Sequence, residues 1–399
     1  VFRSNTLVAM ARSILPEPPD DLKRLSRELQ QRLRDAMQAD GCISFARFMD
    51  MALYEPGLGY YSAGLHKLGA AGDFVTAPEL GGLFGACLAR QAAELAAELG
   101  RWSILEIGAG TGRLAATVLR ELDERHLPQR YAILERSADL REVQRRTLAA
   151  EAPERLDRVT WLDGPPTEPW PGLLLANEVI DALAVERFEI RDGAVRQLCV
   201  RPQGDGFAWC TRAAPAVLDA AVRHLEADTG TQLADGYRSE ILPRLPAWLD
   251  AVAGPLERGL ALFIDYGYPR REYYRPERRD GTLMCHYRHR AHDDVFFWPG
   301  LQDLTAWVDF TALAEAADAC GLDVDGYTSQ AMFLAGCDLE AVLGEKMATA
   351  DDGGSALAAE ARQLTLPGLM GERFQVMGLG RGLEREPRGF SLLDLRFRL

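Results

Sequence analysis

The chain has 399 residues, 47% of them hydrophobic and 26% charged, a composition that excludes a disordered or fibrous protein. Its formal net charge of -14 disfavours binding to the phosphate backbone of nucleic acids. No run of eighteen apolar residues occurs, so we expect no membrane insertion.

The N-terminal hundred residues predict a helical cap and a long loop. Leucines recur at spacings of three and four across residues 20–39, a spacing typical of an amphipathic helix. Further helices are expected at 44–53 and 82–99. Between them, residues 54–74 are rich in glycine and tyrosine, and long loops of this kind are usually functional. Residues 1–100 are therefore assigned to the cap and its glycine-rich lid loop.

Strands and helices alternate over the next eighty residues. Apolar runs predict strands and amphipathic runs predict helices, in the order strand 103–107, helix 114–122, strand 131–134, helix 137–149, strand 159–162 and strand 173–176. This alternation is typical of a parallel sheet with helices on both faces. The predicted fold class is α/β, a doubly wound Rossmann-like sheet, and residues 101–184 form its first half.

The alternation is then interrupted and later resumes. Two alternating runs around Asp192-Gly193 predict a hairpin, because Asp-Gly is a favoured hairpin turn. Residues 185–258 are assigned to an inserted subdomain with a helix near 241–252, and residues 259–399 to the second half of the sheet. The expected elements of that half are strand 260–265, helix 310–319, strand 322–327 and strand 374–379. An Arg- and His-rich loop, 269–305, is expected within it.

The run Glu106-Ile107-Gly108-Ala109-Gly110-Thr111-Gly112 lies where a strand ends and a helix begins. Glycines there let the backbone approach a ligand, and the helix N-terminus offers unpaired N–H groups. A dinucleotide fold uses the same corner for a pyrophosphate. The G-x-G-x-G spacing and the preceding acid instead resemble the first motif of class I methyltransferases. Glu106, Gly108, Gly110 and Gly112 are therefore candidate S-adenosyl-L-methionine ligands.

Acids follow the second and third strands. Glu135 ends the second strand, where a carboxylate accepts hydrogen bonds from both ribose hydroxyls of a nucleoside. Asp163 follows the third strand and is a candidate for the adenine amine. Each acid also has a simpler interpretation, as a helix-capping or solvated carboxylate.

Polar residues also follow the fourth and fifth strands. Asn177 is a candidate cofactor ligand at the end of the fourth strand, followed by Glu178 and Asp181. Two acids at the ligand crevice suit the binding of a cationic nitrogen or the removal of its proton. Asp265, after the fifth strand, is a third candidate, and the adjacent Tyr266 can pack against a cation. The alternative interpretation is a helix start with capping acids.

Residues 281–292 hold three of the six histidines but show no zinc-binding spacing. We therefore predict no metal site and expect this loop to shape the acceptor site. The seven cysteines are scattered and form no C-x-x-C pair. This pattern predicts reduced thiols, no structural zinc and a cytoplasmic location.

Together, these motifs resemble the MidA-like methyltransferase family, which includes the mitochondrial complex I assembly arginine methyltransferase. The glycine motif matches with Ala109 in place of the usual proline, and 177–183 matches the next hallmark. The other shared runs are Gly59-Tyr60-Tyr61, Gly72 to Glu79, Leu83-Phe84-Gly85, Ile264 to Gly267, Gly281-Thr282-Leu283, Asp303-Leu304-Thr305 and Val308-Asp309-Phe310. They extend over most of the chain.

The resemblance implies a class I fold, S-adenosyl-L-methionine as methyl donor, S-adenosyl-L-homocysteine as product, and an acceptor arginine on a protein, such as an NADH dehydrogenase subunit. A lid loop containing Gly72, Asp73, Phe74 and Thr76 is expected to close over the cofactor. Glu178, Asp181 and Asp265 are the predicted catalytic residues. A non-catalytic assembly factor, a small-molecule methyltransferase and a nicotinamide-dependent dehydrogenase are the alternatives.

Overall fold

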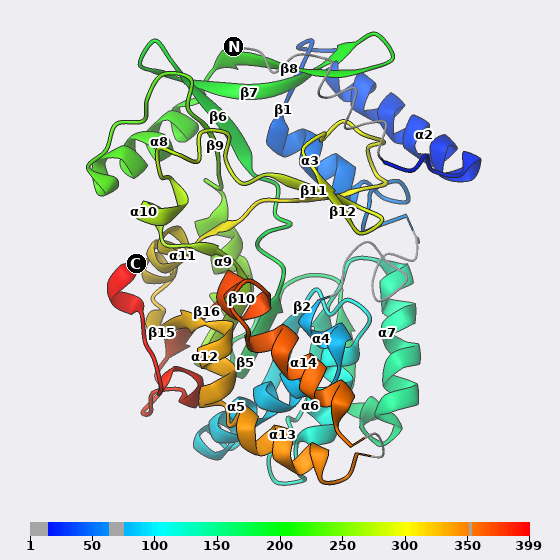
Figure 1. Ribbon diagram of the computed structural model, residues 1–399, viewed down its shortest axis with the longest axis vertical. Coiled ribbons are helices and arrows are strands. Elements are labelled where there is room, and N and C mark those ends of the chain that lie inside the picture. The colour runs from blue at the N-terminus through cyan, green and yellow to red at the C-terminus, as the bar shows by residue number, and fades with distance from the viewer. Residues whose placement is uncertain (1–14, 64–75, 351–352) are drawn as a thin grey trace. The chain divides into compact units, whose positions relative to one another are not determined.

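The computed structural model describes residues 15–63, 76–350 and 353–399 (Figure 1). Internal contacts divide the chain into two units, each assembled from segments that are distant in sequence. The first unit comprises residues 1–74, 181–243 and 270–307, and the second comprises 75–180, 244–269 and 308–399. These boundaries differ from the four predicted segments, and that four-part division stays a prediction.

The second unit contains a large sheet. Its strands are β2 (Ser103–Ile107), β3 (Tyr131–Leu134), β4 (Val159–Leu162), β5 (Trp170–Asn177), β10 (Leu256–Tyr268), β15 (Asp323–Ser329) and β16 (Phe374–Arg381). They lie in the order β15-β16-β10-β5-β2-β3-β4, and the short β14 (Val308–Asp309) pairs with the end of β10. The five strands from β10 to β4 are parallel, whereas β16 is antiparallel to both its neighbours. The predicted α/β doubly wound sheet is confirmed.

Both faces of this sheet are covered. Five consecutive residues of β10, from Leu260 to Ile264, are at most 1% exposed, and a strand buried on alternate sides needs packing on both faces. Helix α5 (Leu83–Leu99) contacts β5 and β10, while α11 (Phe310–Ala319) contacts β10, β15 and α9 (Leu245–Ala253). The continuous apolar run of β10 is therefore the sequence pattern expected of a strand covered by helices on both faces.

The remaining helices of the second unit surround the sheet. They are α4 (Ala77–Leu80), α6 (Arg113–Glu121), α7 (Ala138–Glu151), η1 (Pro153–Arg158), α12 (Gln330–Gly336), α13 (Leu339–Met347), α14 (Ser355–Thr365), α15 (Met370–Arg373), η2 (Arg388–Phe390) and η3 (Arg396–Arg398). Ser137 caps α7, because its hydroxyl accepts the Leu140 N–H at 3.3 Å.

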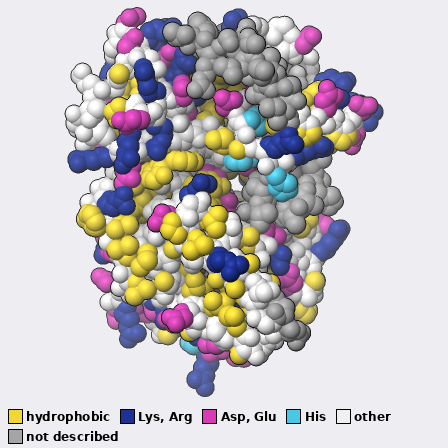
Figure 2. Space-filling view, in the orientation of Figure 1, with side chains coloured by type: hydrophobic (Ala, Val, Ile, Leu, Met, Phe, Trp, Pro, Cys, Tyr) yellow, Lys and Arg dark blue, Asp and Glu magenta, His cyan; other side chains and the backbone are white. Residues whose placement is uncertain are grey.

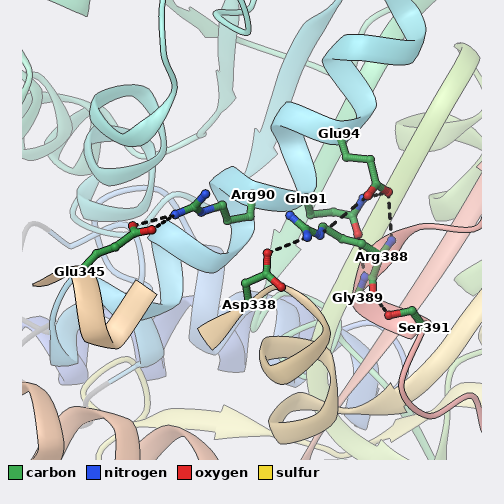
Figure 3. A network of polar contacts seen from close by, with 8 residues as sticks. All are labelled: Arg90, Gln91, Glu94, Asp338, Glu345, Arg388, Gly389 and Ser391. Atoms are coloured by element: carbon green, nitrogen blue, oxygen red, sulfur yellow. Dashed lines mark hydrogen bonds and ion pairs between the residues drawn. The ribbon is translucent and has the colours of Figure 1, made fainter. Parts of the chain in front are cut away.

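A polar network joins α5 to α13 and to the C-terminal residues (Figure 3). Arg90 makes two bonds to the Glu345 carboxylate at 2.9 and 2.7 Å, an exposed pair of small energetic value. Gln91 is 1% exposed and accepts the Gly389 N–H at 3.0 Å. Because a buried amide left unpaired costs about 1–3 kcal/mol, the Gln91 bond to the C-terminal segment stabilises the fold more than the exposed ion pair between α5 and α13 does.

The described residues of the first unit form two smaller sheets and four helices. Its elements are α2 (Asp20–Met37), β1 (Ile43–Ser44), α3 (Phe45–Tyr54), β6 (Glu186–Arg191), β7 (Ala194–Gln203), β8 (Gly206–Ala213), α8 (Ala216–Thr229), β9 (Arg238–Ile241), α10 (Arg270–Tyr273), β11 (Met284–Tyr287), β12 (Arg290–His292) and β13 (Asp303–Thr305). One sheet has the order β1-β7-β6-β9, with β8 on β7, and the other has the order β12-β11-β13.

The predicted hairpin forms in this unit, with Asp192 and Gly193 both at positive φ, 52° and 69°. The predicted helix near 241–252 begins only at Leu245. Ile241 instead ends β9, where it pairs with Glu186, and Pro246 stands in the first turn of α9. Within the described ranges, no helix is long and apolar enough to cross a membrane.

Candidate active site

The sheet reverses direction beside β2. The chain runs from β2 outward through β3 to β4 and then returns to β5 on the other side of β2. In an open parallel sheet, ligands bind at the carboxyl ends of the strands at such a switch point. The glycine motif follows β2 and Asn177 ends β5, so both predicted motifs lie at this position.

The glycine turn has a backbone that other residues rarely adopt. Gly108, Gly110 and Gly112 have φ values of 65°, 53° and 86°. A Cβ on Gly112 would lie 3.1 Å from the Cα of Gln144, so α7 packs directly against the turn. The Thr111 hydroxyl donates to the Glu79 carboxylate, which ties the turn to α4. The turn therefore presents its backbone to a ligand at a fixed position.

Glu106 is a buried acid at the end of β2. Its side chain is 3% exposed, and its Oε2 accepts the Tyr131 hydroxyl at 2.8 Å. Burial raises the pKa of Glu106 to about 7, with a further increase from Glu135 and an opposing effect of the Tyr131 hydrogen bond. The carboxyl group therefore titrates near neutral pH in the folded protein.

This raised pKa makes the stability of the ligand-free protein pH-dependent. An unfolded glutamate loses its proton near pH 4.5, whereas folded Glu106 keeps its proton up to about pH 7. The folded state therefore binds more protons between these values, and the free energy of unfolding falls as the pH rises through them. Glu106→Gln should raise stability by about 1 kcal/mol or less at pH 5 and by about 3 kcal/mol at pH 8.

Urea unfolding of both proteins at the two pH values provides the measurement. An equal difference between them at pH 5 and pH 8 would contradict the raised pKa.

Glu135 follows β3 and points toward the start of α7. Its Oε1 accepts the Ser137 N–H at 2.8 Å, and its Oε2 accepts the Gln144 Nε2 at 3.2 Å. Burial raises the pKa of Glu135, and these donors act in the opposite direction. The predicted adenine contact, Asp163, has a side chain that is 96% exposed and pairs with Arg141 at 2.9 Å.

Glu178 is held in an unusual conformation. Its φ is 54°, in the left-handed region that costs a non-glycine residue of order 1–3 kcal/mol. Its N–H donates to the Ile264 carbonyl at 2.9 Å, and its Oε2 accepts the Tyr266 hydroxyl at 3.0 Å. The Asn177 Nδ2 donates to Oε1 at 3.2 Å. Strained residues held by several contacts are frequent at functional sites, which directs attention to this carboxylate.

Asp265 holds the backbone beside Glu178. It is 1% exposed, its Oδ2 accepts the Ile180 N–H at 3.0 Å, and its Oδ1 accepts the Tyr266 N–H at 2.9 Å. Tyr266 is further fixed by an edge contact with Phe374, with ring centroids 4.5 Å apart. Both Asp265 oxygens thus bind main chain, an arrangement that positions the turn carrying Glu178.

The other predicted residues are distributed as follows. Asp181 belongs to the first unit, is 3% exposed, and its carbonyl accepts the Ala306 N–H at 2.9 Å. Thr76 stands directly before α4 in the second unit. The remaining lid residues, Gly72, Asp73 and Phe74, lie outside the described residues.

The Arg- and His-rich loop contains a tight hairpin in the first unit. Arg288 and His289 connect β11 to β12 with φ values of 47° and 60°, positions where glycine or asparagine is usual. Figure 2 shows basic and histidine side chains on the surface over these strands. In the part of the chain that the structure describes, no group of three or more His, Cys, Asp or Glu side chains could hold a metal ion.

Two contributors were missed by the sequence analysis. Gln144 binds both the glycine turn and Glu135, yet a glutamine within a helix gives no periodic signal. Tyr131 binds Glu106 across neighbouring strands. Tyr131 pairs with Ile104 on the neighbouring strand, and Ile104 lies two residues before Glu106 on the same face of the sheet. A pairing of the two predicted strands could therefore have indicated the contact between Tyr131 and Glu106.

Known proteins resemble the chain over most of its length. A family model described as S-adenosyl-L-methionine-dependent methyltransferase matches residues 87–328. The mitochondrial protein arginine methyltransferase NDUFAF7 of Danio rerio is 26% identical over 91% of this chain and 90% of the relative. Its Drosophila melanogaster homologue is 26% identical over 92% and 90%. A Burkholderia thailandensis crystal structure with bound S-adenosyl-homocysteine is 39% identical, covers 96% of this chain and 100% of that one, and has a TM-score of 0.91.

These names correct one prediction. The relatives are named mitochondrial, which contradicts the cytoplasmic location predicted for this chain. The physical reason is that scattered cysteines argue against a disulfide framework without specifying which reducing compartment holds the protein.

Proposed function

This chain belongs to the S-adenosyl-L-methionine-dependent methyltransferase family, and on that premise we propose that it methylates an arginine of a protein substrate, such as a subunit of respiratory NADH dehydrogenase. The observation that carries the acceptor class is the resemblance to protein arginine methyltransferases over about nine-tenths of both chains. The strained, buttressed Glu178 supports it independently, since a guanidinium acceptor needs a carboxylate fixed in advance.

The residues of the switch point suit the cofactor. The left-handed glycine turn leaves room for the backbone to approach a nucleoside, and Glu135 offers carboxylate oxygens for the ribose hydroxyls. The Oδ1 of Asn177 is buried without a hydrogen-bond partner among the described residues. An ammonium group would satisfy this oxygen, so we assign Asn177 to the amino-acid end of the cofactor.

Methyl transfer is an in-line displacement in which the bound sulfonium supplies an electrophilic methyl group. The protein must align the acceptor nitrogen and exclude water. A guanidinium is protonated at neutral pH and its lone pair is delocalised. Glu178 binds one guanidinium nitrogen, concentrates positive charge there, and leaves the other nitrogen more nucleophilic. The proton released by the methylated nitrogen then passes to this carboxylate or to solvent.

Tyr266 and Asp265 hold Glu178 and its backbone in place. The Tyr266 hydroxyl holds the Glu178 carboxylate at 3.0 Å, and Asp265 holds the backbone that follows. The roles of Asp181 in acceptor binding and of Asp163 at the adenine stay predictions.

An in vitro labelling assay tests the acceptor class. The purified chain is incubated with methyl-tritiated S-adenosyl-L-methionine and a panel of NADH dehydrogenase subunits, and the labelled protein is hydrolysed to amino acids. The label should appear in methylarginine. Label on lysine, on a carboxylate or on a small molecule would refute the arginine acceptor while leaving methyl transfer intact.

A further inference from the structure

Gln144 is a buried amide that connects three elements of the cofactor site. It lies on α7 and is fully buried. Its Nε2 donates to the Gly110 carbonyl at 3.1 Å and to the Glu135 Oε2 at 3.2 Å. Its Oε1 accepts the Trp161 indole N–H at 2.9 Å. These partners come from the glycine turn, the end of β3 and β4, all within the second unit.

The orientation of this amide is fixed by chemistry. An indole N–H only donates, so the Gln144 oxygen must face Trp161. Both hydrogens of Nε2 are then directed to the Gly110 carbonyl and the Glu135 carboxylate, which only accept. A rotated amide would set an oxygen against both acceptors. The Gln144 backbone packs closely against the glycine turn, since a Cβ on Gly112 would lie 3.1 Å from the Gln144 Cα.

We propose that Gln144 is a positioning residue, which sets the Glu135 carboxylate at a defined distance from the glycine turn so that the two bind the ribose end of the cofactor together. The inference rests on the proposed ribose contact of Glu135. Gln144 and the Ser137 N–H each hold one Glu135 oxygen, and the Arg136 N–H also donates to this carboxylate, which fixes the carboxylate plane and leaves a lone pair for a ribose hydroxyl.

The test compares S-adenosyl-homocysteine with its 2′-deoxy analogue. In the native protein, calorimetry should show tighter binding of the ribose ligand. Gln144→Met keeps the side-chain length and removes both donors, so it should weaken S-adenosyl-homocysteine binding about tenfold, the loss expected from a disturbed charged hydrogen bond. It should leave binding of the 2′-deoxy analogue nearly unchanged. Gln144→Asn, which is too short to reach both acceptors, should behave alike and serves if the methionine variant is insoluble.

Two further variants separate a positioning role from a merely structural one. Trp161→Phe removes the third partner of the amide but leaves both donations, so it should keep the preference for the ribose ligand. In a Glu135→Ala background, Gln144→Met should have little additional effect, because the carboxylate that it positions is gone. The melting temperature of each variant verifies folding.

The outcomes distinguish the ribose-binding role of Glu135 from the positioning role of Gln144. If Glu135→Ala binds both ligands as the native protein does, the ribose role of Glu135 is wrong, and the positioning role loses its basis. If Glu135→Ala loses the preference but Gln144→Met and Gln144→Asn retain it, only the role of Gln144 is overturned. Equal weakening of both ligands by the Gln144 variants would show a structural role and also overturn the inference.

Discussion

Glu178→Gln should retain cofactor affinity and lose about 99% of methyl-transfer turnover, a loss of the size seen when one preorganised electrostatic group is removed. Glutamine has the same shape, and its one oxygen still accepts the Tyr266 hydroxyl while the bond from Asn177 is lost. The backbone bond from residue 178 to the Ile264 carbonyl is kept. The charge that holds and polarises a guanidinium is gone. The effect should therefore appear in the rate of a single turnover rather than in cofactor binding.

The measurement combines calorimetry with S-adenosyl-homocysteine and rapid-quench kinetics on the methylated protein. Glu98→Gln is the matched control, because it removes a partly buried carboxylate that pairs with Arg258 elsewhere in the second unit. Its turnover should stay near the native value. A loss of cofactor affinity in Glu178→Gln without a slower chemical step would instead place Glu178 in the donor site.

Gly110→Val should abolish measurable cofactor binding, with an affinity loss of at least 100-fold. Gly110 has a φ of 53°, which a β-branched residue adopts only with strain. The valine methyl groups would also project from the turn that faces the nucleoside. The affinity for S-adenosyl-homocysteine, measured by calorimetry, should fall below detection while most of the fold remains.

Strain alone must be separated from ligand exclusion. Gly368→Val provides the control, since Gly368 lies in the same unit, has a φ of 79°, and has open space where a Cβ would project. It should lose stability and keep cofactor affinity. Equal affinity losses in both variants would assign the Gly110 effect to the backbone alone.

The sequence predicted the strands and the glycine motif because each is specified by neighbouring residues. The glycine run and the apolar strands each lie within a few residues, and all are found where expected. Helix α8 and strand β9 were not predicted, because their burial depends on partners far along the chain. For the same reason the sequence did not show that the N-terminal residues and both insertions form one unit.

The sequence predicted which residues lie at the candidate site, but it did not predict their hydrogen-bond partners. Glu106, Glu135, Asn177 and Glu178 all lie at or just after the carboxyl ends of strands of the parallel sheet, which a count of strands can show. The sequence singled out Asp265 without showing that its oxygens accept main-chain N–H groups from Ile180 and Tyr266. Sequence gives the position of a carboxylate and not the direction in which it points.

Heavy-methyl labelling in cells tests the central claim most directly. Cells grown on methionine with an isotopically labelled methyl group are compared with and without this gene, and with the gene carrying Glu178→Gln. Proteome-wide mass spectrometry should find an arginine site whose heavy methylation is present with the native gene and absent in the other two. If no arginine differs among the three while another methylated residue or a small molecule does, the proposed acceptor is contradicted.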